Sequence, residues 1–263
     1  MDGRSRPESI ENDWGLLYRD YADVYDRFAA VPKAPTWSEV VCERFDLSGK
    51  RVLDVGTGSG RSIARLVPHA GEVIGLDVEA AMLAVARTNL VGGGLEGVRL
   101  VAGDSAQLPL AADSIDVVTA ITLASLYYYE PTVAFCREAE RVTRPGGVVI
   151  TVNIAPRWYG GELAEVVLGM PRSEMQPTER EAALVDCGFE WLDYFSDADY
   201  GSVENTVATY GFIFGKRVIA HIRENGIQRV RWKTRVHFKR MPGAGAGETD
   251  KVLGDPSGVP SGW

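Results

Sequence analysis

The chain has 263 residues, of which 45% are hydrophobic and 24% are charged, and its formal net charge is −8. This is enough to bury one large core, as one domain or a domain with a cap, and the acidic balance disfavours wholesale binding to polyanions. There is no apolar run of about 18 residues, no N-terminal secretory signal and no CxxC pair. We therefore expect a soluble, cytoplasmic protein without a membrane span, a disulfide framework or a metal site; its three cysteines are Cys42, Cys136 and Cys187.

Residues 1–46 are predicted to form an N-terminal helical cap or lid. Residues 1–12 are polar, and we expect them to be disordered. Between residues 14 and 28, bulky side chains recur at steps of three and four, which indicates one face of an amphipathic helix. The face consists of Trp14, Leu17, Tyr18, Tyr21, Val24, Tyr25 and Phe28. A second short helix is expected over residues 38–45.

A regular alternation of strands and helices begins at residue 51. Five short, β-branched, nearly continuous apolar runs suit strands that are buried on both faces of a parallel sheet. Helical stretches, such as residues 79–90 and 132–143, separate most of them. The repeated order of strand, helix and strand predicts a doubly wound, Rossmann-like α/β sheet. The runs cover residues 51–56, 72–77, 98–104, 115–122 and 147–153.

The C-terminal part is predicted to complete the sheet and then leave it. A helix over residues 178–187, ended by Gly188, precedes strands over 189–195 and 206–214. These strands bring the sheet to about seven strands and extend the Rossmann-like core over residues 47–215. A helix over 216–225 and a strand over 229–239 are expected to form a small basic extension, residues 216–240. The tail, residues 241–263, is rich in glycine and proline and is expected to be disordered.

A glycine-rich turn follows the first core strand. It reads Asp54-Val-Gly56-Thr-Gly58-Ser-Gly60 and leads directly into a helix. Glycines permit a tight turn and let a ligand lie against the main chain. The dinucleotide fingerprint needs its third glycine at position 61, where this chain has Arg61, and no Gly-Lys-Ser/Thr of a Walker loop follows. The Asp54 carboxylate would repel a pyrophosphate and attract an ammonium group.

These segments resemble the class I S-adenosylmethionine-dependent methyltransferases, specifically the small-molecule branch that includes the ubiquinone/menaquinone-biosynthesis-like enzymes. VLDVGTGSG resembles the loop that holds the methionine part of the cofactor, LDVEAAML the segment whose acid binds the ribose, and VAGDSAQLPL the adenine-binding segment. SIDVVTAITLAS and RVTRPGGVVI resemble the fourth strand and the turn into the fifth. DYADVYDRF resembles the segment that folds over the cofactor.

The resemblance implies that S-adenosyl-L-methionine is the cofactor. It implies that Asp77 accepts hydrogen bonds from the ribose hydroxyls and that Asp104 accepts one from the adenine amine. Both acids are predicted at the carboxyl ends of strands, where α/β folds bind ligands. The implied cofactor-binding residues are Asp54, Gly56, Thr57, Gly58, Gly60, Asp77, Val78, Asp104, Ser105 and Thr122.

The candidate catalytic residues are three tyrosines. Tyr21 and Tyr25 lie on the predicted helical face, which would either close over the cationic sulfonium or simply pack on the sheet. Tyr127 follows the fourth core strand, where an acceptor should bind. The branch often has a histidine at that strand exit, but ITLASLYYY contains none, and His69, His221 and His237 are predicted to be peripheral. Methyl transfer can proceed by positioning alone, because the sulfonium is already activated.

The function implied is methyl transfer to a small-molecule acceptor at an O, N or C atom. The alternatives are a tRNA or rRNA methyltransferase that uses the basic C-terminal segment, and a non-catalytic cofactor-binding partner of another enzyme. Nucleic acid is the less favoured partner, because the motifs for base-amine and cytosine-carbon methylation are absent from the sequence. The basic strand over residues 229–239 has two interpretations: an edge strand or hairpin outside the main sheet whose cations pair with the acidic remainder of the chain, or an anion site.

Overall fold

Eight strands form one mixed sheet in the computed structural model, which describes residues 7–243. The order across the sheet is β1-β7-β8-β6-β5-β2-β3-β4. Strands β6, β5, β2, β3 and β4 run parallel, whereas β8 is antiparallel to both of its neighbours and β1 is antiparallel to β7. The bounds are β1 Lys33–Ala34, β2 Arg51–Val55, β3 Glu72–Asp77, β4 Arg99–Ala102, β5 Ile115–Ile121, β6 Thr143–Ile154, β7 Glu190–Asp199 and β8 Arg229–Arg240. The predicted doubly wound α/β class is confirmed.

Helices cover both faces of the sheet because neighbouring strand residues point to opposite sides. Leu53 belongs to the apolar cluster with α6 (Tyr129–Val142) and α8 (Glu179–Asp186). Val52, the residue before it, belongs to the cluster with α3 (Trp37–Arg44), α4 (Arg61–Leu66) and α5 (Ala80–Gly92). The core strands read as continuous apolar runs for this reason.

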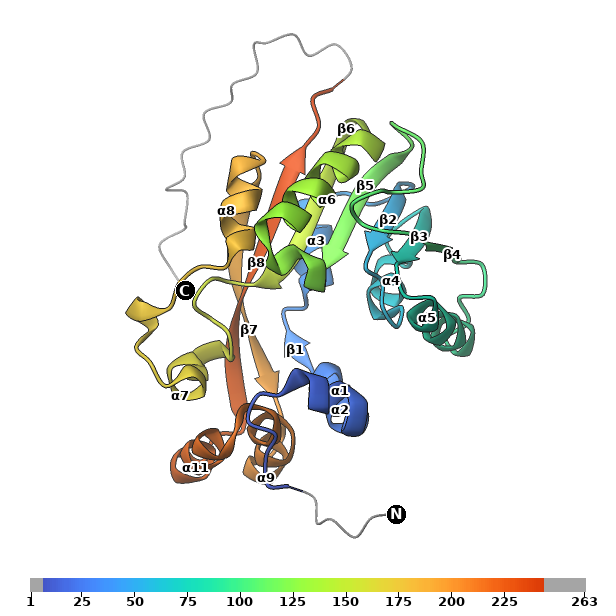
Figure 1. Cartoon of the computed structure of the whole chain (residues 1–263). Coiled ribbons are helices and arrows are strands. Elements are labelled where there is room, and N and C mark those ends of the chain that lie inside the picture. Colours follow the sequence, from blue (N-terminus) through green and yellow to red (C-terminus); the bar gives the residue numbers. More distant parts are fainter. Residues whose placement is uncertain (1–6, 244–263) are drawn as a thin grey trace.

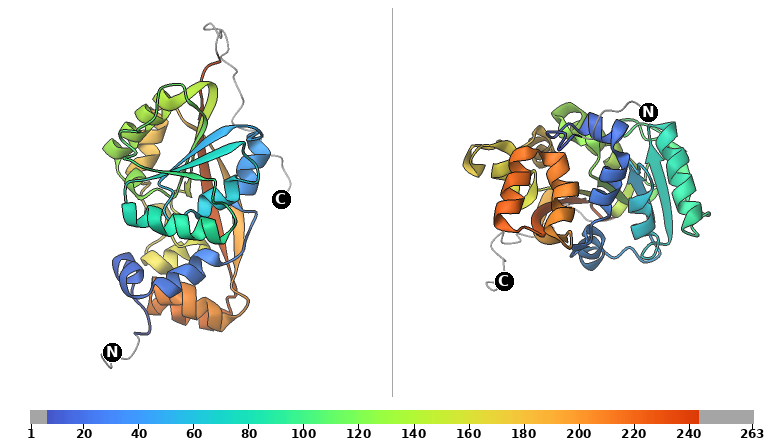
Figure 2. Two further views of the ribbon diagram at one scale, coloured as in Figure 1. Left: turned by 90° about the vertical axis from the view of Figure 1, so that its right-hand side faces the viewer. Right: turned by 90° about the horizontal axis from the view of Figure 1, so that it is seen from below.

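A group of short helices lies beyond the carboxyl ends of the parallel strands (Figures 1 and 2). Long strands β7 and β8 extend toward this group, and a third apolar cluster joins its members around the buried Tyr210. The helices are α1 (Trp14–Asp20), α2 (Ala22–Ala30), α7 (Ala164–Leu168), α9 (Val203–Thr206), α10 (Phe212–Phe214) and α11 (Lys216–Asn225). Three 3₁₀ segments, Ala124–Tyr127, Gly161–Leu163 and Arg172–Glu174, and a π-helical turn, Val207–Gly211, complete the elements. None of the helices within residues 7–243 has the length and apolar character needed to cross a membrane.

Two predicted elements differ from the structure. The helix expected over residues 14–28 is interrupted at Tyr21, whose non-helical backbone (φ −133°, ψ 39°) ends α1 and begins α2. Residues 206–214 were expected as a strand but are helical throughout. Their apolar run, TVATYGFIF, is buried on nearly all sides, and periodicity cannot distinguish such a helix from a buried strand.

The predicted edge position of residues 229–239 is wrong. β8 lies inside the sheet, with β6 on one side and β7 on the other. The expected pairing of its cations with acids of the same chain is confirmed, because β7 places Asp193, Asp197 and Asp199 directly opposite Arg235, Arg231 and Arg229. Opposite charges across neighbouring strands stabilise this register. The division into cap, core and C-terminal segment stays a prediction.

The chain ends are partly described. Of the N-terminal segment expected to be disordered, residues 7–12 have a definite path: Ile10 is buried, and its N–H donates to the carbonyl of Phe212 at 2.9 Å. The disorder expected for residues 1–6 and 244–263 lies outside the described residues. Met241, at the start of the expected disordered tail, donates its N–H to the carbonyl of Gly147 at 2.8 Å.

Candidate functional site

The predicted cofactor-binding residues come together at one edge of the sheet. Gly56 follows β2, Asp77 ends β3, Asp104 follows β4 and Thr122 follows β5. These four strands are parallel neighbours in the sheet, so their carboxyl ends lie side by side. The four segments are far apart in sequence, and the sheet alone brings them together.

The glycine loop requires glycine for two local reasons. Gly56 has φ +73°, a left-handed conformation that side chains rarely adopt, and a Cβ there would lie 2.2 Å from Cδ1 of Leu123. The N–H groups of Gly56 and Thr57 both donate to the carbonyl of Leu76, at 2.8 and 2.9 Å. Gly60 then adopts φ +84° as the N-cap residue of α4. The loop is therefore a tight, backbone-lined turn between β2 and α4.

Asp77 connects the ends of β2 and β3. Its Oδ2 accepts from the N–H of Gly58 at 2.8 Å, and its Oδ1 accepts from the N–H of Glu79 at 2.9 Å. A carboxylate has about four acceptor positions, so further donors such as a pair of ribose hydroxyls can still bind. Val78 beside it is 66% exposed and Met82 is 37% exposed. An acid flanked by open apolar side chains fits a nucleoside, which has a polar sugar and a flat apolar base.

Asp54 lies beneath the loop. The side chain is completely buried, and burial raises the pKa of its carboxyl group, against hydrogen bonds from hydroxyl groups that act in the opposite direction. The hydroxyl of Ser62 in α4 donates to one oxygen, and that of Thr119 in β5 donates to the other at 2.9 Å. Through these two hydrogen bonds, Asp54 connects β2 to β5 and to α4 beneath the turn. Its predicted attraction of an ammonium group stays a prediction.

The remaining predicted contacts come from the exits of β4 and β5. Asp104 is exposed, and its Oδ1 accepts from the N–H of Ala106 at 2.8 Å. Ser105 is half-buried, with its hydroxyl 3.5 Å from that of Ser125. Thr122 has φ +51°, which is a genuine outlier for a β-branched residue, and its N–H donates to the carbonyl of Val152 at 2.9 Å. Backbone strain of this kind concentrates at ligand sites.

The helical cap reaches the loop through Tyr25. Its ring lies 5.7 Å from the guanidinium of Arg61, the first residue of α4 after the glycine turn. Tyr21 instead packs edge-on against Phe212, with ring centroids 5.0 Å apart. The structure therefore brings one of the two predicted lid tyrosines next to the glycine loop and places the other in the packing of the cap.

Replacing Tyr25 with alanine is expected to weaken binding of S-adenosylmethionine by about two- to fivefold, because the cationic sulfonium would lose one cation–π contact at a partly exposed position. Tyr25→Phe keeps the ring and should bind as the wild type does. Isothermal titration calorimetry of the wild type, Tyr25→Ala and Tyr25→Phe proteins measures the three affinities. Equal affinity of Tyr25→Ala and wild type would leave α2 with a packing role only.

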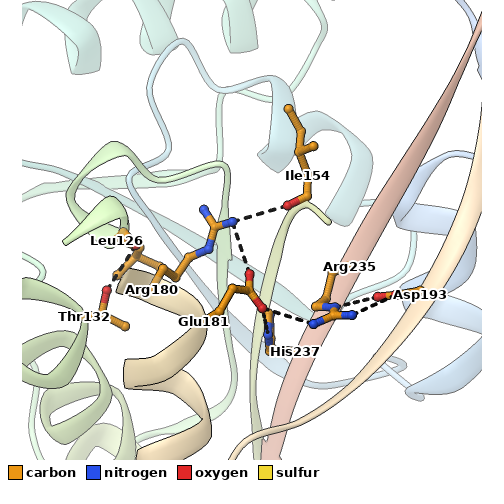
Figure 3. Close-up of polar contacts among 8 residues, drawn as sticks. All are labelled: Leu126, Thr132, Ile154, Arg180, Glu181, Asp193, Arg235 and His237. Atoms are coloured by element: carbon orange, nitrogen blue, oxygen red, sulfur yellow. Dashed lines mark hydrogen bonds and ion pairs between the residues drawn. The ribbon is translucent and has the colours of Figure 1, made fainter. Parts of the chain in front are cut away.

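Tyr127, the third candidate, lies in a separate pocket of about 100 Å³. This pocket opens at the end of β6, next to the exit of β5. The hydroxyl of Thr132 in α6 donates to the carbonyl of Leu126 at 3.2 Å and so holds the 3₁₀ segment that contains Tyr127 (Figure 3). The polar residues that line it are Tyr127, Arg157, Tyr159, Gln176, Thr178 and Arg180. The sequence interpretation missed Arg157 and Arg180. For Arg180 a signal existed, because it shares one face of α8 with the buried Ala183 and Leu184.

A buried polar cluster adjoins this pocket (Figure 3). The Glu181 carboxylate accepts from Arg235 at 3.2 Å and lies 3.0 Å from Nε2 of His237, while Arg235 also makes two hydrogen bonds to Asp193. Burial alone would raise the pKa of Glu181, but the hydrogen bond from His237 and the charges of His237, Arg180 and Arg235 outweigh it and lower the pKa. His237 is completely buried, so its predicted peripheral position is wrong.

Known proteins resemble this chain over the segment that contains the glycine loop. Residues 53–151 match the family model described as "Methyltransferase domain". The demethylmenaquinone methyltransferase of Geobacillus stearothermophilus is 32% identical over 162 residues, which cover 58% of this chain and 68% of that enzyme. The corresponding enzyme of Geobacillus kaustophilus is 34% identical over 145 residues, which cover 52% of this chain and 61% of the relative, less than two thirds of its length.

The fold also has solved counterparts. The structure of the [4+2]-cyclase SpnF superimposes with a TM-score of 0.56 at 19% identity, over 90% of this chain and 97% of that protein. This similarity shows the fold alone. The matching family model, the sequence relatives and the predicted motifs at the strand ends agree on one family. The chain belongs to the class I S-adenosylmethionine-dependent methyltransferases, in the branch of the ubiquinone/menaquinone-biosynthesis-like enzymes.

Proposed function

We propose that this protein transfers a methyl group from S-adenosylmethionine to a small organic acceptor. The observation that carries the proposal is the convergence of the glycine loop, Asp77, Asp104 and Thr122 at the carboxyl ends of four parallel neighbouring strands. The names of the sequence relatives support the acceptor class, since both refer to methylation of demethylmenaquinone. Which atom is methylated, O, N or C, is left open by the proposal.

The residues of the chain have separate roles in this proposal. The turn between Gly56 and Gly60 holds the methionine part of the cofactor, Asp77 holds the ribose, and Val78 and Asp104 hold the adenine. Bound S-adenosylmethionine supplies an already activated methyl group, so orienting the acceptor can provide much of the rate enhancement. Ser105 and Thr122 line the side from which the acceptor approaches the cofactor. The catalytic roles of Tyr21, Tyr25 and Tyr127 stay predictions.

The pairing of the basic strand supports a small acceptor over RNA. Arg231 is bound to Asp197 at 2.8 Å, and Lys233 and Arg235 are both bound to Asp193, at 2.8 and 2.6 Å. Binding of phosphates requires cations that are available to replace counterions. Cations already neutralised within the sheet are poor candidates for that role. A cytoplasmic location stays part of the proposal.

A transfer assay with methyl-labelled S-adenosylmethionine tests the function. The purified protein is incubated with an extract of the organism that encodes it, and the extract is then separated into protein, nucleic-acid and small-molecule fractions. Once unreacted S-adenosylmethionine has been removed, we expect label in the small-molecule fraction, and we expect this label to be lost with Asp77→Ala. Label in RNA would favour the tRNA or rRNA alternative. No label in any fraction, with S-adenosylhomocysteine still bound, would favour the non-catalytic alternative.

A further inference from the structure

The pocket beside Tyr127 contains a buried cation with an unused donor. Arg180 is 2% exposed, and its Nη2 donates to the carbonyl of Ile154 at 3.3 Å and contacts Glu181 at 3.4 Å (Figure 3). Its Nε has no hydrogen-bond partner anywhere in residues 7–243. An unsatisfied buried donor on a charged group is costly, so a natural structure that keeps one often uses it for a ligand.

A second unused polar atom lines the same pocket. Thr178 is the N-cap residue of α8, the position from which a threonine hydroxyl normally accepts a backbone N–H of the first turn. Here the hydroxyl makes no such bond, and within the described chain its Oγ1 has no partner. The start of α8 therefore presents a buried hydroxyl and the positive end of the helix dipole at the pocket wall.

The charges next to the pocket do not balance. Three cations, Arg180, Lys233 and Arg235, share two carboxylates, those of Glu181 and Asp193. Both carboxyl groups have lowered pKa values, because their bonds to these cations and, for Glu181, to His237 outweigh the effect of burial. One positive charge is left over, and Arg180 is the most deeply buried of the three cations.

Other acids do not neutralise this wall. Among the described residues that line the pocket none is Asp or Glu. Glu179, in the first turn of α8, accepts instead from the N–H of Tyr129 at 3.1 Å. Arg157 adds a second cation to the lining, with its Nε donating to the carbonyl of Met175 at 3.0 Å. The pocket is thus positive, small and partly apolar.

We propose that this pocket binds a carboxylate group of the methyl acceptor, with Nε of Arg180 and the hydroxyl of Thr178 donating to its two oxygens. The inference rests on the proposed function and specifies its substrate class. The pocket opens at the end of β6, which lies two strands, or roughly 10 Å, from β2, the strand that leads into the glycine loop. An acceptor anchored by its carboxylate therefore directs a different, more distant atom toward the cofactor, and its product keeps the carboxylate.

Paired probes test the carboxylate site without knowledge of the acceptor. Acetate, benzoate and phenylacetate are each compared with the corresponding primary amide by calorimetry, on protein saturated with S-adenosylhomocysteine. We expect at least one carboxylate to bind about tenfold or more tightly than its amide, as a charge-assisted hydrogen bond allows. Arg180→Gln should abolish this preference, and Thr178→Val should reduce it. Arg231→Gln removes a cation from the same sheet outside the pocket and should keep the preference.

A charge measurement on the natural product gives a second test. The labelled small molecule from the transfer assay should be retained by an anion exchanger at pH 8. A labelled product without a carboxylate group, or carboxylates that bind no better than their amides while S-adenosylhomocysteine binds normally, would overturn the carboxylate site and leave the methyltransferase proposal intact. Absence of cofactor binding or of any labelled product would count against the proposed function itself. If Arg180→Gln does not fold, the carboxylate preference of the Thr178→Val protein and the analysis of the labelled product still test the site.

Discussion

Asp77→Ala is expected to lower the affinity for S-adenosylhomocysteine by more than about a hundredfold in a folded protein. Two hydrogen bonds from ribose hydroxyls to the carboxylate would be lost, and bonds to a charged group contribute about 1.5–3 kcal/mol each. The same carboxylate accepts from the N–H groups of Gly58 and Glu79, so the glycine loop would also lose its tie to β3. Calorimetry measures the affinity, and circular dichroism checks the fold.

Two variants make this result specific. Asp77→Asn keeps the shape and one carbonyl oxygen, and we expect an affinity between those of wild type and Asp77→Ala. Asp199→Ala removes an equal charge from the far end of β7, where the carboxylate pairs with Arg229, and should bind as the wild type does. Unchanged affinity in a folded Asp77→Ala protein would remove the central assignment of the site.

Glu181→Gln is expected to lower the free energy of unfolding by about 3–5 kcal/mol, because it removes the acid from a buried ion-pair cluster and leaves cations without compensation. The carboxylate is shared by Arg180, Arg235 and His237. Urea unfolding followed by circular dichroism measures the change. Glu140→Gln is the matched control: its carboxylate also faces β8, through Lys239, but both side chains are about one third exposed, so the loss should stay below about 1 kcal/mol.

The same cluster predicts a sensitivity to acid. The pKa of Glu181 is lower in the folded protein than in the unfolded chain, where a glutamate titrates near about 4.3. Its contribution is therefore complete above that value and is lost as the pH falls through the lower, folded pKa. Wild type should lose stability between about pH 5 and pH 3 more steeply than Glu181→Gln. Parallel pH profiles of the two proteins would mean that the carboxylate contributes nothing to acid stability.

Much of the fold and of the candidate cofactor site could be predicted from the sequence, because the signals are local. A strand buried on both faces needs an apolar run, and a turn with φ near +73° next to Leu123 needs Gly56. Asp77 and Asp104 follow such runs, and parallel strands bring their carboxyl ends to one edge. Residues 206–214 show the limit of this reasoning, since a run enclosed by neighbours on all sides is apolar as a helix or as a strand.

The sequence by itself predicted the glycine loop, the acids at the strand ends and the alternation of apolar and basic side chains along residues 229–239. Only the tertiary structure decided where that strand lies, because an alternating pattern specifies which face is buried but not which strands are its neighbours. The tertiary structure also determined where the pocket beside Tyr127 lies and that its lining is positively charged. Glu181 meets Arg235 and His237 across 54 and 56 residues of chain, and no local pattern encodes contacts at that separation. Folding the sheet brings these side chains together and leaves Arg180 with a donor that the described chain does not use.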